Sequence, residues 1–138
     1  MRPILLLPSL LLLSACAGPL PSADPQQAWV TVQGAPGVSL MATRLNGLAV
    51  NDGRYFQLSP GPHTLQVRLQ FELPGGGANG LSEPQTRSCL FALSYAHFAA
   101  GQSYRLRGGQ QGYRGWVRLY DPQQQVLARG KQLRCGGF

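Results

Sequence analysis

Apolar and polar side chains alternate most strictly in residues 58–73, which read LSPGPHTLQVRLQFEL. From residue 65 onward every second side chain is apolar, and those between them are polar. A period of two is typical of a strand with one face in a core and the other towards water. The Pro-Gly-Pro stretch before it predicts a turn, because proline fixes φ and glycine permits a positive φ. We therefore expect residues 63–73 to form the central strand of a domain.

Other short segments rich in β-forming residues lie between turn signals and predict further strands. They are residues 29–33, 38–45, 55–58, 86–96, 104–107, 116–120 and 126–133. Asn46-Gly47 predicts a type I′ hairpin turn, and residues 108–112 (GGQQG) predict another turn. No stretch has a long 3.6-residue period. The pattern predicts an all-β fold, a single antiparallel β-sandwich of about seven or eight short strands.

A glycine-rich segment, residues 74–84 (PGGGANGLSEP), follows the central strand. Its four glycines and two flanking prolines are incompatible with a regular element and predict a long loop. A phosphate-binding loop would end in Gly-Lys-Ser/Thr and lead into a helix, and neither feature is present.

The first fifteen residues have the pattern of a secretory signal peptide. A positive start at Met1-Arg2 leads into an apolar run over residues 4–13. This run is too short to span a membrane, which takes about 20 apolar residues. An uncleaved anchor or a buried helix is the alternative, and Pro3 and Pro8 disfavour a long regular helix.

The signal-like stretch ends in Leu13-Ser14-Ala15-Cys16, which resembles the lipobox of bacterial lipoproteins. The resemblance implies a diacylglyceryl group on the Cys16 thiol, cleavage before Cys16 and acylation of the new amino terminus. An ordinary cleavage site with an incidental cysteine is the alternative. Ala17, where an aspartate would act as a retention signal, implies sorting to the cell outer membrane, with the protein on its periplasmic face.

Composition divides the rest of the chain into a tether and one domain. Residues 16–27 are rich in proline and small residues and predict a flexible tether, which leaves residues 28–138 for the β-sandwich domain. The 138-residue chain has a net charge of +7, and without Arg2 eleven basic residues face five acidic ones. A basic surface attracts anionic lipid, glycan or nucleic acid. A periplasmic address excludes nucleic acid, and a simple solvated surface is the alternative.

Two cysteines remain once Cys16 carries lipid. Cys89 and Cys135 are an even pair in an oxidising compartment, and this pattern favours a disulfide. Two free thiols or a metal pair are the alternatives. A metal site would need more ligands, and the only histidines are His63 and His97. We expect no metal and no cofactor.

Asn51-Asp52-Gly53 and the stretch LSPGPHTLQV at residues 58–67 give a turn, a short strand, a Pro-Gly turn and then an alternating strand. In this pattern the domain resembles the PEGA-type β module. Residues 98–106 (FAAGQSYRL) are similar to a strand of small uncharacterised bacterial lipoproteins. The resemblance covers about residues 38–107 and implies a small transthyretin-like sandwich that binds or spaces rather than catalyses. The glycine-rich loop and the disulfide candidate depart from the module's pattern.

Few residues offer catalytic chemistry. Glu72 and Glu83 flank the glycine-rich loop and would meet if that loop closed a hairpin, and His63 has the chemistry of a general base. A small envelope hydrolase that uses Glu72, Glu83 or His63 is therefore the alternative function. Charges solvated at the edge of a loop are the simpler interpretation, and no nucleophile motif is present. We do not expect an enzyme.

The best candidate for binding is Tyr113-Arg114-Gly115-Trp116, with Arg118 two residues later and Arg105 and Arg107 nearby in sequence. Aromatic rings beside arginines stack on sugars or bind anionic groups. A core tryptophan beside exposed arginines is the alternative. The sequence thus predicts a non-catalytic envelope lipoprotein, a binding or structural module. Its membrane anchor would be the lipid on Cys16, and its partner an envelope protein or an anionic envelope polymer.

Overall fold

The computed structural model describes residues 18–74 and 83–136. The predicted signal peptide, Cys16 and most of the glycine-rich loop lie outside these residues. The described part contains ten strands. They are β1 (Ala28–Gly34), β2 (Ser39–Leu45), β3 (Leu48–Ala49), β4 (Tyr55–Leu58), β5 (Gly61–Leu73), β6 (Gln85–Phe98), β7 (Ser103–Gln111), β8 (Arg114–Tyr120), β9 (Val126–Arg129) and β10 (Lys131–Gly136).

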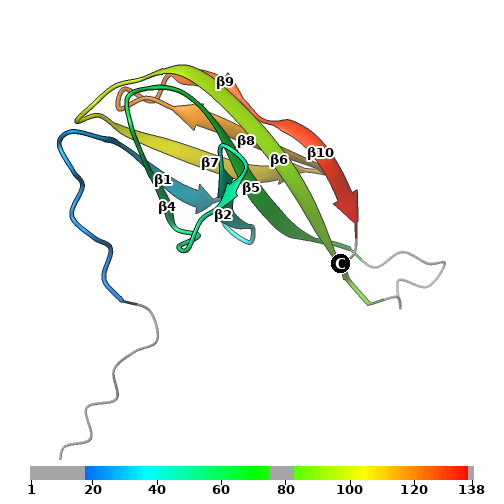
Figure 1. Cartoon of the computed structure of the whole chain (residues 1–138). Helices are drawn as coiled ribbons and strands as arrows, with labels where there is room; N and C mark the ends of the chain where they lie inside the picture. Colours follow the sequence, from blue (N-terminus) through cyan, green and yellow to red (C-terminus); the bar gives the residue numbers. More distant parts are fainter. Residues whose placement is uncertain (1–17, 75–82, 137–138) are drawn as a thin grey trace, which may run out of the picture.

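The strands form two five-stranded sheets that pack face to face, as Figure 1 shows. We call them sheet A, with strand order β4-β1-β7-β8-β9, and sheet B, with strand order β10-β6-β5-β2-β3. The expectation of an all-β sandwich is confirmed. The expected number of strands was too low, because the sequence pattern does not separate β3 or divide the last strand.

Sheet A is mixed, so the expectation of a purely antiparallel sandwich was wrong. β1 pairs in parallel with β7, from Trp29 opposite Ser103 to Gly34 opposite Gly108. All the other strand pairs are antiparallel. β1 and β7 are far apart in sequence, and an alternating pattern carries no information on the direction of a distant neighbour.

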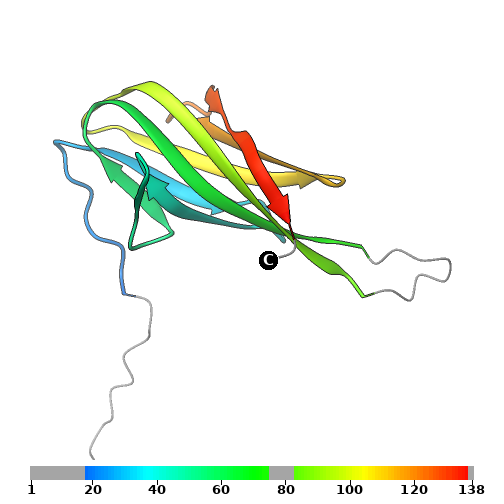
Figure 2. The ribbon, with the colours of Figure 1, turned by 45° about the vertical axis from the view of Figure 1, so that its right-hand side comes forward.

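The central strand of the sequence pattern is β5, and its assigned faces are confirmed. Leu65, Val67, Leu69 and Phe71 are buried, whereas Arg68 and Glu72 are exposed. β5 and β6 pair from Gly61 opposite Phe98 to Leu73 opposite Gln85. This long hairpin extends beyond the rest of the sandwich (Figure 2).

The core lies between the two sheets and receives apolar side chains from both. Its buried members are Ala28, Val30, Val32, Leu40, Ala42, Phe56, Leu58, Leu65, Val67, Leu69, Phe71, Cys89, Phe91, Leu93, Phe98, Tyr104, Leu106, Val117 and Leu119. Burial of this apolar surface is the main force that holds the sheets together.

Residues 108–112 do not form the predicted turn. β7 continues to Gln111, and the turn comes at Gly112, which has a φ of +61°. Gly108 and Gly109 lie within the strand. Glycine is favoured at both positions because neighbouring side chains occupy the space that a Cβ would need. A Cβ on Gly108 would lie 2.9 Å from Leu69 Cδ1, and one on Gly109 would lie 2.6 Å from the Trp116 indole.

The strand predicted over residues 126–133 is divided at Gly130, where the chain passes from sheet A to sheet B. Gly130 N–H donates a hydrogen bond of 2.7 Å to the carbonyl oxygen of Val117. A Cβ at residue 130 would lie 2.9 Å from Val117 Cβ, so the close passage at this corner favours glycine. The segment therefore becomes two strands, β9 and β10.

Cys89 and Cys135 form a disulfide, as the sequence predicted. They are direct neighbours across β6 and β10, and their Cα atoms lie 4.0 Å apart. The bond ties β10, the last strand of the chain, to the neighbouring strand β6 of sheet B.

The domain begins with a short turn before β1. The backbone N–H of Gly101 donates to the carbonyl oxygen of Gln27 at 2.9 Å, and the Gln57 amide donates to the Gln27 side chain at 2.6 Å. Further back, Arg54 Nη1 donates to the carbonyl oxygen of Gly18 at 3.0 Å. The described N-terminal segment thus meets the domain beside β4. No helix within residues 18–74 and 83–136 is long and apolar enough to cross a membrane.

Candidate functional site

The β7–β8 hairpin carries the residues that the sequence singled out for binding. Along β8, Val117 and Leu119 point into the core, so Trp116 and Arg118 lie on the outer face of sheet A. Tyr113, at the hairpin turn, is 66% exposed, and Arg114 is exposed at the start of β8. The structure therefore brings Trp116 and Arg118 together on one face and leaves Tyr113 at the tip.

Strand register adds more arginines to this outer face. Arg107 lies directly opposite Arg118, and Arg118 lies directly opposite Arg129. Arg105 lies on the same face, two residues before Arg107 on β7. We call Arg105, Arg107, Trp116, Arg118 and Arg129 together the arginine face.

Trp116 lies on the sheet surface and not in the core. Its indole covers Gly109, its neighbour across β7 and β8, where a Cβ would collide with the ring. The guanidinium carbon of Arg118 lies 4.6 Å from the centre of the indole, a cation–π contact. Trp116 is only half-buried, so part of the indole is open to solvent.

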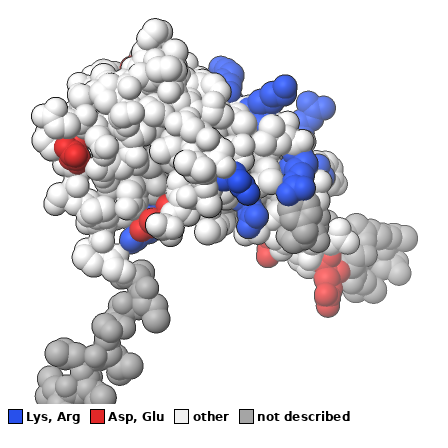
Figure 3. Space-filling model, viewed as in Figure 1, with Lys and Arg blue, Asp and Glu red and all other residues white. Residues whose placement is uncertain are grey.

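Within residues 18–74 and 83–136, no acidic side chain forms an ion pair with the arginine face. Among the described residues, no hydrogen bond or ion pair holds the guanidinium groups of Arg105, Arg107 or Arg129. Figure 3 shows the side of the molecule on which sheet B lies, with Lys and Arg side chains near β9 and β10 and acidic ones towards the left and lower margins. The arginine face can therefore attract anions.

A second aromatic group lies at the other edge of sheet A. Trp29 and Tyr55 stack with their ring centres 4.5 Å apart and their planes 7° apart. Both rings are half-buried on the outer face of β1 and β4. The sequence did not indicate this pair, because it depends on the register of two strands that are distant in the chain.

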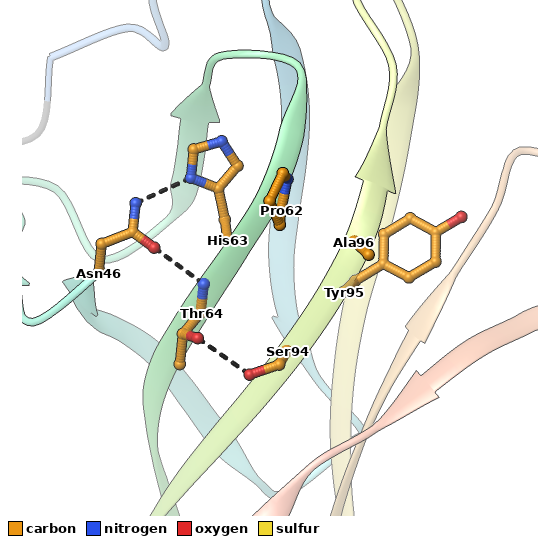
Figure 4. A pocket seen from close by; sticks show the side chains of 7 residues that line it. All are labelled: Asn46, Pro62, His63, Thr64, Ser94, Tyr95 and Ala96. Atoms are coloured by element: carbon orange, nitrogen blue, oxygen red, sulfur yellow. Dashed lines mark hydrogen bonds between the residues drawn. The ribbon is translucent and has the colours of Figure 1, made fainter.

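His63 lines an open hollow of about 310 Å³ with Asn46, Thr64, Ser94 and Tyr95 (Figure 4). Asn46 Nδ2 lies 2.8 Å from His63 Nδ1, and His63 Nε2 lies 2.7 Å from the carbonyl oxygen of Ser59. A carbonyl accepts only, so Nε2 carries the proton and Nδ1 accepts from Asn46. Both ring nitrogens are thus engaged in holding the turn.

The rest of that hollow is a hydrogen-bonded surface. Thr64 N–H donates to Asn46 Oδ1 at 2.9 Å, and the hydroxyls of Thr64 and Ser94 lie 2.9 Å apart. Burial raises the pKa of the Tyr95 phenol, and nearby Tyr104 raises it further, so this hydroxyl stays protonated at neutral pH.

The two candidate carboxylates do not join His63. Glu72 lies on the outer face of β5, nine residues beyond His63 on the same strand, a distance of about 30 Å at strand rise. The hollow beside Glu72 is lined by residues that include Gln70 and Thr86, and by neither Glu83 nor His63. Glu83 is exposed before β6. The structure therefore places no two of these three residues in either hollow.

One carboxylate is strongly held by a charged partner. Asp52 accepts hydrogen bonds from the Arg54 side chain, the shortest of them 2.7 Å, and from its backbone N–H at 3.0 Å. These bonds lower the pKa of Asp52 from 3.8 to about 2. The pair fixes the turn before β4 and is structural.

No group of three or more His, Cys, Asp or Glu side chains with the arrangement of a metal site occurs in the part of the chain that the structure describes. No protein-family model, no curated protein and no solved structure matches the chain. The arginine face is therefore interpreted from its own geometry.

Proposed function

We propose that this protein is a non-catalytic binding module of the bacterial cell envelope, held by lipid on Cys16 at the periplasmic face of the outer membrane. The observation that carries the proposal is the arginine face, a basic surface with a partly open indole ring and no acidic partner within the described part of the chain. Its partner would be an anionic polymer of the envelope or another envelope protein.

The lipobox at residues 13–16 supports the anchor. Each buried CH₂ contributes about 0.8 kcal/mol, and stable anchoring takes more than one acyl chain, so a cysteine that carries three would stay on the membrane. The disulfide between Cys89 and Cys135 is consistent with export to an oxidising compartment. The resemblance to PEGA-type modules supports a role in binding or spacing.

The alternative function is a small envelope hydrolase that uses Glu72, Glu83 or His63. A hydrolase of this kind needs a pair of groups that act on one bond. His63 has both ring nitrogens engaged by neighbours, and Glu72 lies far along the same strand. No observation in the described residues favours this alternative over binding.

Metabolic labelling tests the anchor. Cells that express the wild type or Cys16→Ser receive an alkyne analogue of palmitate, and the purified protein is then probed for the label. We expect label in the wild type alone and loss of membrane retention in Cys16→Ser. Equal labelling of the two proteins would contradict a lipoprotein.

Crosslinking in intact cells tests the binding role. We expect the wild type to recover an envelope component, and Arg118→Ala to recover much less of it. Arg68→Ala removes an exposed arginine from sheet B and is the control. Equal recovery by both variants would exclude the arginine face as the binding surface.

A further inference from the structure

Three arginines form a continuous row across three neighbouring strands. Arg107 on β7, Arg118 on β8 and Arg129 on β9 occupy directly opposite positions of the ladder. Adjacent strands lie about 4.8 Å apart, so the row spans about 10 Å of sheet surface. Arg105 extends the row along β7.

Such a row is unfavourable for folding by itself. Like charges directly opposite each other on neighbouring strands destabilise a sheet. Here the repulsion occurs twice in one row, and the cation–π contact of Arg118 with Trp116 relieves only part of it. Features that break a local rule of stability are typical of functional sites.

The acids of the described residues all lie away from this row. Asp24 and Asp52 occupy turns, Glu72 is on β5 of sheet B, and Glu83 precedes β6. Asp121 follows β8, but its Oδ1 accepts from the backbone N–H groups of Gln123 and Gln125, at 2.9 and 2.8 Å. The negative charge that balances the row of arginines must therefore come from a ligand.

The rings near the row indicate which kind of anion fits. Trp116 presents a partly open indole beside Arg118, and Tyr120 is half-buried on the same face, opposite Arg105. The flat C–H face of a sugar ring is apolar and packs on such rings, whose polar edges still reach water. Guanidinium groups bind carboxylate or phosphate in a two-pronged fashion. Together they fit a polymer of acidic sugars.

The row also lies towards the edge of sheet A that is opposite the N-terminal segment. Gly18 contacts Arg54, just before β4, and β4 is one edge of the sheet. The row lies on the last three strands of the order β4-β1-β7-β8-β9, towards the opposite edge. The chain therefore enters the described domain beside β4, away from the row. This arrangement favours a polymer over the anchoring membrane as the occupant.

We propose that the arginine face binds an acidic polysaccharide, which lies across β7, β8 and β9 with its anionic groups on Arg107, Arg118 and Arg129. The proposal deepens the proposed function and rests on it for the cellular setting alone. Binding itself depends on the described domain and can be measured without the anchor.

Binding is measured with the purified full chain in a non-ionic polyoxyethylene detergent and fluorescent polygalacturonate as the probe. We expect Arg118→Ala to weaken binding about tenfold, the effect of one charged hydrogen-bonded contact. Arg118→Lys keeps the charge and loses the two-pronged geometry, so it should fall between the wild type and Arg118→Ala. Arg68→Ala, on sheet B, should bind like the wild type.

Two competitors identify the source of the anion. Unlabelled polygalacturonate should displace the probe, whereas its methyl ester, which is neutral, should not. Phosphatidylglycerol added to the same micelles should leave binding within about twofold. Displacement by phosphatidylglycerol would make an anionic membrane the occupant and would overturn the proposal.

Other outcomes overturn it as well. Absence of binding by the wild type, or equal losses for Arg118→Ala and Arg68→Ala, would contradict a specific site. Circular dichroism and the unfolding midpoint of each variant show that it is folded. Palmitate labelling of Cys16 is measured separately. A protein that carries the label but does not bind the polysaccharide would contradict this inference and would still support the lipid anchor.

Discussion

Leu69 and Gly115 face each other across the core, and substitution of both residues tests the packing of the two sheets. Leu69 is fully buried on β5, and a Cβ added at Gly115 would lie 2.5 Å from its Cδ2 atom. The same Cβ would also lie 3.4 Å from Phe71 and from Phe91. Leu69→Ala should therefore cost about 2–5 kcal/mol of unfolding free energy through the cavity it leaves.

Gly115→Ala alone should cost about 1–3 kcal/mol, because the added methyl group displaces a packed side chain. In the double variant the methyl group enters the space that Leu69 has vacated. We therefore expect the double variant to lose less than the two single variants combined, by about 1 kcal/mol or more.

Urea unfolding of the oxidised protein measures all four members of this cycle, with the midpoints compared at a common slope. Arg68→Ala, one residue from Leu69 on the solvent face, should stay within about 0.5 kcal/mol of the wild type. Strictly additive losses would mean that the β7–β8 hairpin does not pack on Leu69, and the relation of the two sheets would be wrong.

Three further predictions concern the ties that hold the fold. Cys135→Ser should lower the unfolding free energy by about 2–5 kcal/mol. In the wild type, alkylation without reduction should modify neither Cys89 nor Cys135, and modification of either would refute the disulfide. Asp52 has a folded-state pKa of about 2, below its unfolded value, so its stabilisation is present above about pH 4 and lost as the pH falls towards 2. Asp52→Asn should flatten that part of the stability–pH curve, and an unchanged curve would exclude the Arg54 contact. Asn46→Gly, which tolerates the positive φ of residue 46, should lower the unfolding free energy by about 1–2 kcal/mol, since His63 and the Thr64 N–H lose a partner. Asn51→Gly, in the neighbouring turn, is the control, and equal losses would contradict the contact.

The sequence predicts the strands well where a buried face repeats every second residue. β5 alternates between water and a core, and β4 matches its expected bounds residue for residue. Asn46 and Gly47 both have positive φ, +51° and +82°, as the predicted type I′ turn requires. These features depend on local backbone preferences and on the alternation of buried and exposed residues. A short stretch of sequence is enough to predict both.

The sequence fails where a distant segment supplies the missing contact. In the sequence, Gly108 and Gly109 have the pattern of a turn. In the structure they lie in a strand where Leu69 and Trp116 occupy the space beside them. The parallel pairing of β1 with β7 joins two segments that are far apart in the chain, and the alternating pattern of each strand does not carry the direction of its distant neighbour. The division at Gly130 follows from a close passage over Val117.

The candidate site divides in the same way. Trp116 and Arg118 could be selected from the sequence, because two residues of one strand at a spacing of two share a face. Arg129 could not, since it joins the row only through the pairing of β8 with β9. A count of basic and acidic residues gives the net charge of the chain, and only the register shows that three arginines are neighbours.

Chemical-shift mapping by NMR tests the central claim, a binding surface on the outer face of sheet A, most directly. The full chain, labelled with ¹⁵N, is titrated with polygalacturonate in the same detergent. The account predicts saturable shifts of the Trp116 indole N–H and of the Arg107, Arg118 and Arg129 side-chain Nε–H signals, with the amides around His63 and Glu72 unchanged. Shifts centred on His63 or Glu72, or no saturable shift on β7, β8 and β9, would contradict it.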